Sequence, residues 1–129
     1  MTQKSEPTTT LVDISDASFE QRVLRQLRPS VVTFWARWNN PSQTQYALIQ
    51  EVAKTYSADE GIQVVGMNVD ESPMISTQYE FDTLPALVLI HQGSVVRTHS
   101  GMASKATIKA MLDEAVALAE RIITTDTFS

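Results

Sequence analysis

The feature that most constrains the fold is a nearly continuous apolar run, Val31 to Ala36, followed closely by the start of a helix. A strand with apolar residues at successive positions is typical of the centre of a sheet that is covered on both faces. Pro41 favours the first turn of a helix, because its missing N–H needs no partner there. The sequence therefore predicts a buried strand, a short turn through Trp38 and Asn39, and a helix.

Similar strand and helix patterns occur along the rest of the chain. Short apolar runs predict further strands at 11–14, 62–69, 86–90 and 95–99. Apolar residues with helical spacing predict helices at about 16–28, 41–56, 73–81 and 104–119. In the first of these helices, Phe19 and Leu27 belong to one apolar stripe. Gln92-Gly93 indicates a hairpin between the last two strands.

This element order predicts an α/β fold. Strands separated by helices favour parallel pairing, and the terminal hairpin adds antiparallel strands to the same sheet. We expect one mixed five-stranded sheet with four helices on both faces. A single domain over 11–123 is expected between a disordered tail at 1–10 and a polar tail at 124–129.

Charge and hydropathy exclude several classes of partner. The chain of 129 residues has 15 acidic and 10 basic residues, a net charge of −5, and so lacks the basic cluster that nucleic-acid binding needs. Arg22, Arg25 and Arg28 lie close together, but the first two fit the solvent face of a helix. No apolar run is long enough to span a membrane, and residues 1–10 do not resemble a secretory signal. We therefore expect a cytoplasmic protein.

The chain contains no cysteine. Its own residues therefore cannot form a disulfide, a thiolate nucleophile or a cysteine metal site. His91 and His99 flank the predicted hairpin, but strand geometry separates them by roughly 17 Å, which favours independent surface histidines. No metal and no cofactor are expected.

Five segments give the chain a resemblance to the thioredoxin family over about residues 10–120. They are Phe34-Trp35-Ala36-Arg37-Trp38, Asn68-Val69-Asp70, Leu84-Pro85, Gln92-Gly93 and Gly101-Met102-Ala103-Ser104-Lys105. The resemblance implies the thioredoxin fold and a cis peptide bond before Pro85. It also implies that Trp35 packs beside the core while Trp38 is exposed.

The chain departs from that family at its reactive positions. Asn39 and Ser42 stand where the family has its attacking and resolving cysteines. Asparagine has no sulfur, and a serine hydroxyl is hardly ionised near neutral pH without a general base. The family's buried acid falls on Thr33, and the lysine that is commonly paired with it falls on Gly66. We interpret these four positions as the loss of the whole exchange apparatus.

The remaining positions of the family's substrate surface define a candidate binding site for a protein or peptide. The resemblance implies peptide contacts at Trp38, Leu84, Pro85, Gly101 and Met102. The plainer alternative is that Pro85 only fixes the turn and Met102 packs on Trp38.

The two degenerate motif positions have plain alternatives too. Asn39 can cap the helix or offer hydrogen bonds to a bound peptide. Ser42 is more simply a tolerated small residue than a hydrolytic nucleophile, because no histidine lies in the motif.

From these residues we expect a redox-inactive, thioredoxin-like protein-binding module that is not an enzyme. It would act as a chaperone-like holder or as an accessory subunit, as a monomer or a weak dimer. The alternatives are a thioredoxin-type thiol–disulfide oxidoreductase, which the family label suggests, and an engineered cysteine-free thioredoxin.

Overall fold

The sheet is the centre of the molecule. The computed structural model describes residues 7–79 and 83–128, with side chains as far as residue 121. Over these residues five strands form one sheet in the order β1-β3-β2-β4-β5. Their bounds are β1 Leu11–Ile14, β2 Ser30–Trp35, β3 Gln63–Asn68, β4 Ala86–His91 and β5 Ser94–Ser100. Strands β1, β3 and β2 are parallel, and β4 and β5 add antiparallel pairs, which confirms the predicted mixed sheet.

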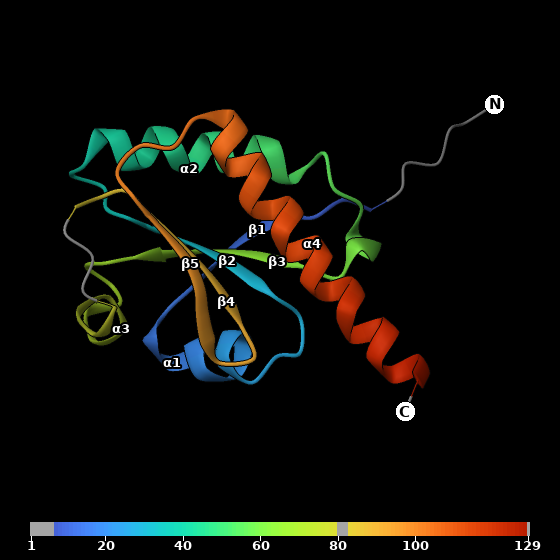
Figure 1. The fold of residues 1–129 in the computed structure, drawn as a ribbon. Coiled ribbons are helices and arrows are strands. Elements are labelled where there is room, and N and C mark those ends of the chain that lie inside the picture. Colours follow the sequence, from blue (N-terminus) through green and yellow to red (C-terminus); the bar gives the residue numbers. More distant parts are fainter. Residues whose placement is uncertain (1–6, 80–82, 129) are drawn as a thin grey trace.

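Helices cover both faces of this sheet, as predicted. In Figure 1, α2 and α4 lie along one face, and α1 and α3 lie on the other. The helical segments are α1 Asp16–Phe19, η1 Glu20–Leu24, α2 Asn40–Ala53, η2 Ala58–Glu60, α3 Pro73–Gln78 and α4 Lys105–Phe128. Within the described residues, no helix combines the length and the apolar character needed to cross a membrane.

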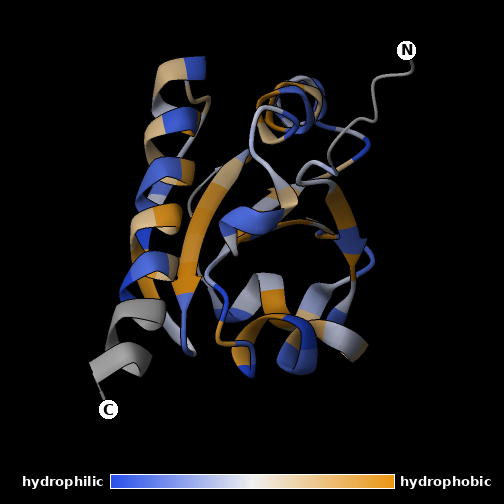
Figure 2. Cartoon of the chain, turned by 90° about the vertical axis from the view of Figure 1, so that its right-hand side faces the viewer, coloured by the Kyte–Doolittle hydropathy of each residue, from blue (hydrophilic) through white to orange (hydrophobic). Residues whose placement is uncertain are grey.

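Two apolar clusters, one on each face, hold the layers together. Val31, Leu87 and Leu89 belong to the cluster under α2 and α4, whereas Phe34 and Val88 belong to the one under α1 and α3. Successive side chains of a strand point to opposite faces, so β2 and β4 contribute to both clusters. Figure 2 shows hydrophobic colour along the strands, while hydrophobic and hydrophilic residues alternate around α4.

The register of the central strands brings three chain segments to one end of the sheet. Phe34 of β2 pairs with Ala86 of β4, and Ala86 pairs with Ser100 of β5. The carboxyl end of β2 therefore lies beside the residues that precede β4 and those that follow β5. This end of the sheet is where the substrate surface implied by the family resemblance would lie.

The first helix is shorter than the sequence predicted. Its regular α-helical part ends at Phe19 and continues as one wide π-helical turn, in which the Arg25 N–H bonds the Glu20 carbonyl at 2.8 Å. The chain leaves the helix after Leu24, so Leu27 is not on the apolar stripe and is 64% exposed. The prediction of a helix to residue 28 is wrong because the wider turn shifts the helical phase.

Both ends of the described chain are more structured than expected. Residues 7–10, predicted to lie in a disordered tail, pair with the segment after α2: the Thr9 N–H bonds the Tyr56 carbonyl at 2.8 Å. Thr8 also forms a bridge with Ser57. Helix α4 extends to Phe128, so most of the predicted polar tail at 124–129 is helical. Residues 1–6 of the predicted tail lie outside the described residues.

Candidate functional site

The turn between β2 and α2 is built around a helix cap at Asn39. Its backbone is extended, with φ −111° and ψ 98°, and its side-chain oxygen accepts a hydrogen bond from the Ser42 N–H at 2.8 Å. The bond satisfies one of the N–H groups that the first helical turn leaves without a partner. The oxygen of Asn39 thus serves the helix cap, while its side chain remains half-buried.

The buried Ser42 side chain links two backbone groups of the turn through hydrogen bonds. Its hydroxyl oxygen accepts from the Ala36 N–H at 3.0 Å and lies 2.8 Å from the Asn39 carbonyl, to which it donates. The side chain is fully buried. A serine in this position closes the turn and offers no accessible nucleophile.

Trp38 stands at the outer edge of the turn. It is 66% exposed, and its indole N–H donates to the Asp70 carboxylate at 2.9 Å. Asp70 follows β3, so this bond anchors the turn to the neighbouring strand. Trp35 is half-buried and packs on the Tyr46 ring, with 5.0 Å between ring centroids. The two tryptophans thus divide into a packed one and an exposed one, as the resemblance implied.

The segment before β4 forms the other side of this end of the sheet. The Leu84–Pro85 peptide bond is cis, as expected. Gly101 donates its N–H to the Pro85 carbonyl at 2.8 Å and has φ 86°, a conformation that favours glycine. Pro85 is buried and Leu84 packs on the cluster under α1 and α3, while Met102 is 49% exposed. The structure thus brings four of the six candidate residues together.

The other two candidates belong to the adjacent turn. The hydrogen bonds of Trp38 and Asn39 go to Asp70 and Ser42, and not to the segments around Pro85 and Gly101. We use the name turn-end surface for the six predicted residues. They are Trp38, Asn39, Leu84, Pro85, Gly101 and Met102.

A side chain at Gly66, where the family has a lysine, would require the Asp13 and Tyr46 side chains to move. A Cβ added to Gly66 would lie 2.5 Å from a carboxylate oxygen of Asp13 and 2.8 Å from the Tyr46 ring. The Tyr46 hydroxyl donates to the Asp13 carboxylate at 3.0 Å. Burial first, and the Asp13 charge second, raise the pKa of Tyr46 to about 12. The hydrogen-bonded side chains of Tyr46 and Asp13 thus fill the space next to Gly66.

Thr33 lies across from Gly66 in the β2–β3 ladder. The side chain is fully buried, and its hydroxyl has no hydrogen-bond partner among the described residues. Thr33 supplies no ionisable group to the turn, in contrast to the buried acid that the resemblance implies for its position.

Two further residues that organise this end of the sheet, Asp70 and Gln45, were not predicted from the sequence. Asp70 was given no role at the turn, although its position two residues after the end of β3 places it there. Gln45 is fully buried on α2, and its side-chain oxygen accepts from the Ala103 N–H at 2.6 Å. Its spacing from Ile49 on the buried face of α2 is the signal that could have identified it.

The two histidines lie at different ends of the last hairpin, and the His99 Nε2 atom is 3.1 Å from the Met102 carbonyl of the turn-end surface. His91 pairs with Ser94 beside the hairpin turn, and His99 pairs with Leu87 further along the ladder. In the part of the chain that the structure describes, no group of three or more His, Asp or Glu residues could hold a metal ion.

Comparison with known proteins assigns the chain to a family. A family model described as Thioredoxin matches residues 10–114. Thioredoxin 1 of Synechococcus elongatus is 35% identical over 101 residues, which cover 78% of this chain and 92% of that protein. Thioredoxin of Acidithiobacillus ferridurans is 36% identical over 100 residues, or 78% and 91% of the two chains. Thioredoxin of Pseudomonas aeruginosa is 35% identical over 103 residues, or 80% and 94%.

These relatives correct two expectations drawn from the sequence. A redox-inactive binding module and the absence of enzymatic activity were expected, whereas relatives named thioredoxin support thiol–disulfide oxidoreductase function. The comparisons do not support a chaperone role either. The inference failed because it gave more weight to two motif positions than to the similarity of the whole chain. Over residues 10–114 the match is continuous, and the chain belongs to the thioredoxin family.

Proposed function

We propose that this protein takes part in the thiol–disulfide oxidoreduction of protein substrates. The observation that carries the proposal is the match of residues 10–114 to the thioredoxin family, with relatives named thioredoxin. The cis Leu84–Pro85 bond and the capped start of α2 at the same end of the sheet are consistent with it.

The sulfur atoms of the exchange come from other molecules, because this chain has no cysteine. A thiolate of a dithiol reductant attacks one sulfur of a substrate disulfide, and the other sulfur leaves as a thiolate. The second thiol of the reductant then resolves the mixed disulfide. The reductant ends as a disulfide, and the substrate gains two electrons and two protons as a pair of thiols.

The part of this chain is to hold the substrate and to stabilise the leaving thiolate. Helix α2 has 14 residues, and its positive end lies at the turn-end surface. Such a helix end favours a nearby anion by about 0.3–1 kcal/mol, which corresponds to roughly a two- to fivefold faster exchange. The extended polypeptide would lie along Leu84 and Pro85, with exposed Trp38 and Met102 as apolar contacts.

A reduction assay tests this function. Insulin disulfides are reduced by dithiothreitol with and without the protein, and the thiols formed are counted by mass spectrometry after alkylation. We expect a rate roughly two- to fivefold above the control without protein. A rate equal to that control over the whole range of protein concentration would contradict the proposal.

Trp38→Ala should remove most of this acceleration, because it deletes the exposed anchor of the substrate. The matched control is Leu27→Ala, since Leu27 has a similar exposure, 64% against 66%, and lies outside the turn-end surface. Thermal melting of both variants checks that the fold is retained. Equal reduction rates for the two variants would show that Trp38 does not contact the substrate.

A further inference from the structure

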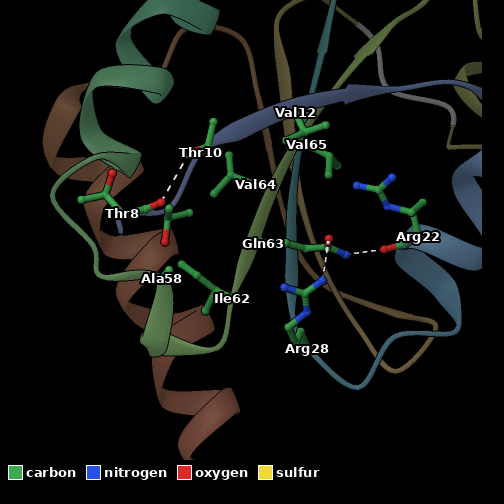
Figure 3. Close-up of a pocket in the computed structure, with 11 residues that line it drawn as sticks. Thr8, Thr10, Val12, Arg22, Arg28, Ala58, Ile62, Gln63, Val64 and Val65 are labelled. Carbon is green, nitrogen blue, oxygen red and sulfur yellow. Dashed lines mark hydrogen bonds between the residues drawn. The ribbon is translucent and has the colours of Figure 1, made fainter. Parts of the chain in front are cut away.

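A pocket lies at the opposite end of the parallel strands from the turn. It has a volume of about 240 Å³, and residues from the segment before β1, from η1 and from β3 line it. Figure 3 shows Arg22 and Arg28 on one side of the pocket and Thr8 and Ala58 on the other. The amino end of β3 at Gln63 is about 17 Å from its carboxyl end at strand rise. The pocket is therefore distinct from the turn-end surface.

Two arginines bring positive charge to the pocket without a carboxylate partner. Within the described residues neither Arg22 nor Arg28 is part of a salt bridge, and both side chains are exposed. Arg25, between them in the sequence, is different, because it pairs with Glu20 at 2.9 Å. No acidic residue is among those described as lining the pocket. The pocket is thus positive although the whole chain has a net charge of −5.

A buried amide contacts both arginine residues, Arg28 through its guanidinium group and Arg22 through its backbone carbonyl. Gln63 is 8% exposed, and its side-chain oxygen accepts from an Arg28 Nη atom at 3.3 Å. Its side-chain nitrogen donates to the Arg22 carbonyl and, at 2.8 Å, to the Ser30 hydroxyl. Figure 3 shows the Gln63 amide between the two guanidinium groups. Only one of the five N–H donors of Arg28 is used in this contact, so the others can bind a ligand.

We propose that this pocket binds a small molecule that carries a phosphate group, held by Arg22 and Arg28. A guanidinium group matches a phosphate with two parallel hydrogen bonds, and a phosphate near neutral pH has a charge of about −1.5 to −2. Two arginines neutralise such a dianion, whereas a carboxylate needs only one. Val12, which lines the pocket and is 42% exposed, provides an apolar contact for the rest of the molecule.

The size of the pocket restricts the ligand. Its volume of about 240 Å³ is below the roughly 300–1,000 Å³ of sites for drug-sized ligands. A phosphate group with a short carbon skeleton fits this space, whereas a dinucleotide does not. The site is therefore independent of the disulfide chemistry proposed for the turn and needs no substrate polypeptide.

Calorimetric titration with inorganic phosphate at constant ionic strength tests the proposal. We expect saturable binding at one site, weakened at least roughly tenfold in the double variant Arg22→Gln/Arg28→Gln, because charge-assisted hydrogen bonds are lost. Arg22→Lys/Arg28→Lys retains the charge and should bind with intermediate affinity. Arg37→Gln is the matched control, since Arg37 is exposed and lies outside the pocket, and it should bind as the unsubstituted protein does.

The other outcomes overturn the proposal. The first is the absence of saturable phosphate binding. The second is an unchanged phosphate affinity in Arg22→Gln/Arg28→Gln. The third is a loss of phosphate affinity in Arg37→Gln that equals the loss in the double variant. Acetate is titrated in parallel, and a tighter binding of acetate than of phosphate would also contradict it. Thermal melting with and without phosphate gives a second readout, because a ligand of the folded state raises its melting temperature. If Arg22→Gln/Arg28→Gln does not fold, Arg22→Lys/Arg28→Lys is used in its place. A phosphate affinity of this variant equal to that of the unsubstituted protein overturns the proposal.

Discussion

The two ends of strands β2 and β3 differ in how their polar side chains are paired. At the carboxyl end, the Asn39 oxygen and the Ser42 hydroxyl bind backbone groups of the turn itself. At the amino end, Gln63 bonds the Arg28 guanidinium group and the Arg22 backbone carbonyl, so most of the guanidinium donors of the two arginines remain unused. Polar side chains at the first end therefore stabilise the turn, whereas those at the second end can bind a ligand.

This difference separates two kinds of functional evidence. The function of the turn end rests on the family to which the chain belongs, because its own polar atoms are used within the fold. The function of the pocket rests on local charge, since the family match says nothing about Arg22 or Arg28. Variants at each end can therefore be tested separately, and effects at sites this far apart are expected to be additive.

The largest effect is expected from Asn39→Cys/Ser42→Cys at the turn end. A thiolate at the start of α2 is stabilised by the positive helix end, and the second cysteine can resolve a mixed disulfide. We expect insulin reduction at least roughly tenfold faster than with the unsubstituted chain. This result would show that the scaffold itself still supports exchange by its own residues.

The matched control for this variant is Leu27→Cys/Val96→Cys. Both positions are exposed, and both lie outside the turn. Similar rates of insulin reduction for the two double variants would mean that a cysteine at the turn reacts no faster than one elsewhere on the surface. The turn end would then have no special role in exchange.

A smaller effect is expected from Gln63→Met at the pocket end. The substitution removes the partners of the buried Ser30 hydroxyl and of the Arg22 carbonyl while it keeps the size of the side chain. Polar groups that lose their partners in this way cost about 1–3 kcal/mol in the free energy of unfolding. Urea denaturation measures the loss, and Gln50→Met on the exposed face of α2 is the control. Equal stability of the two variants would show that Gln63 does not organise the pocket.

The sequence predicted the sheet well because its signals are local. The apolar run around Phe34 and the Gln92-Gly93 turn each predict their own element, and the cis bond before Pro85 followed from the family resemblance. The end of the first helix was predicted wrongly, because the π-helical turn after Phe19 changes the phase without any proline or glycine at that point. Such a change depends on packing and is not visible in periodicity.

The candidate sites were only partly predictable for a related reason. The sequence grouped Arg22, Arg25 and Arg28, but only the fold shows that Glu20 neutralises the second and that Gln63 joins the other two. The Gln63 contacts span 35 and 41 residues of the sequence, and the Glu20–Arg25 pair depends on where the helix ends. The functional class was misjudged because a motif was read by itself, whereas identity over about 100 residues supports oxidoreductase function.

The smallest effect is a change in pH dependence caused by Tyr46, beneath the turn. Burial and the Asp13 charge raise the pKa of Tyr46 to about 12, against about 10 in an unfolded chain. Between pH 10 and 12 the folded chain retains a proton that the unfolded chain has lost, so the free energy of unfolding falls as the pH rises. The stabilising contribution is complete below pH 10 and is lost once the pH passes 12.

Tyr46→Phe removes this titration and should therefore give a shallower loss of stability over that range. Urea denaturation of both proteins at several pH values from 9 to 12 measures the difference. Burial also raises the pKa of Tyr56 and of Tyr79, so part of the dependence remains in the variant. Parallel curves for the two proteins would mean that Tyr46 titrates alike in the folded and unfolded chains. The space beside Gly66 would then be open to water, and the turn end would be less closed than the contacts of its side chains indicate.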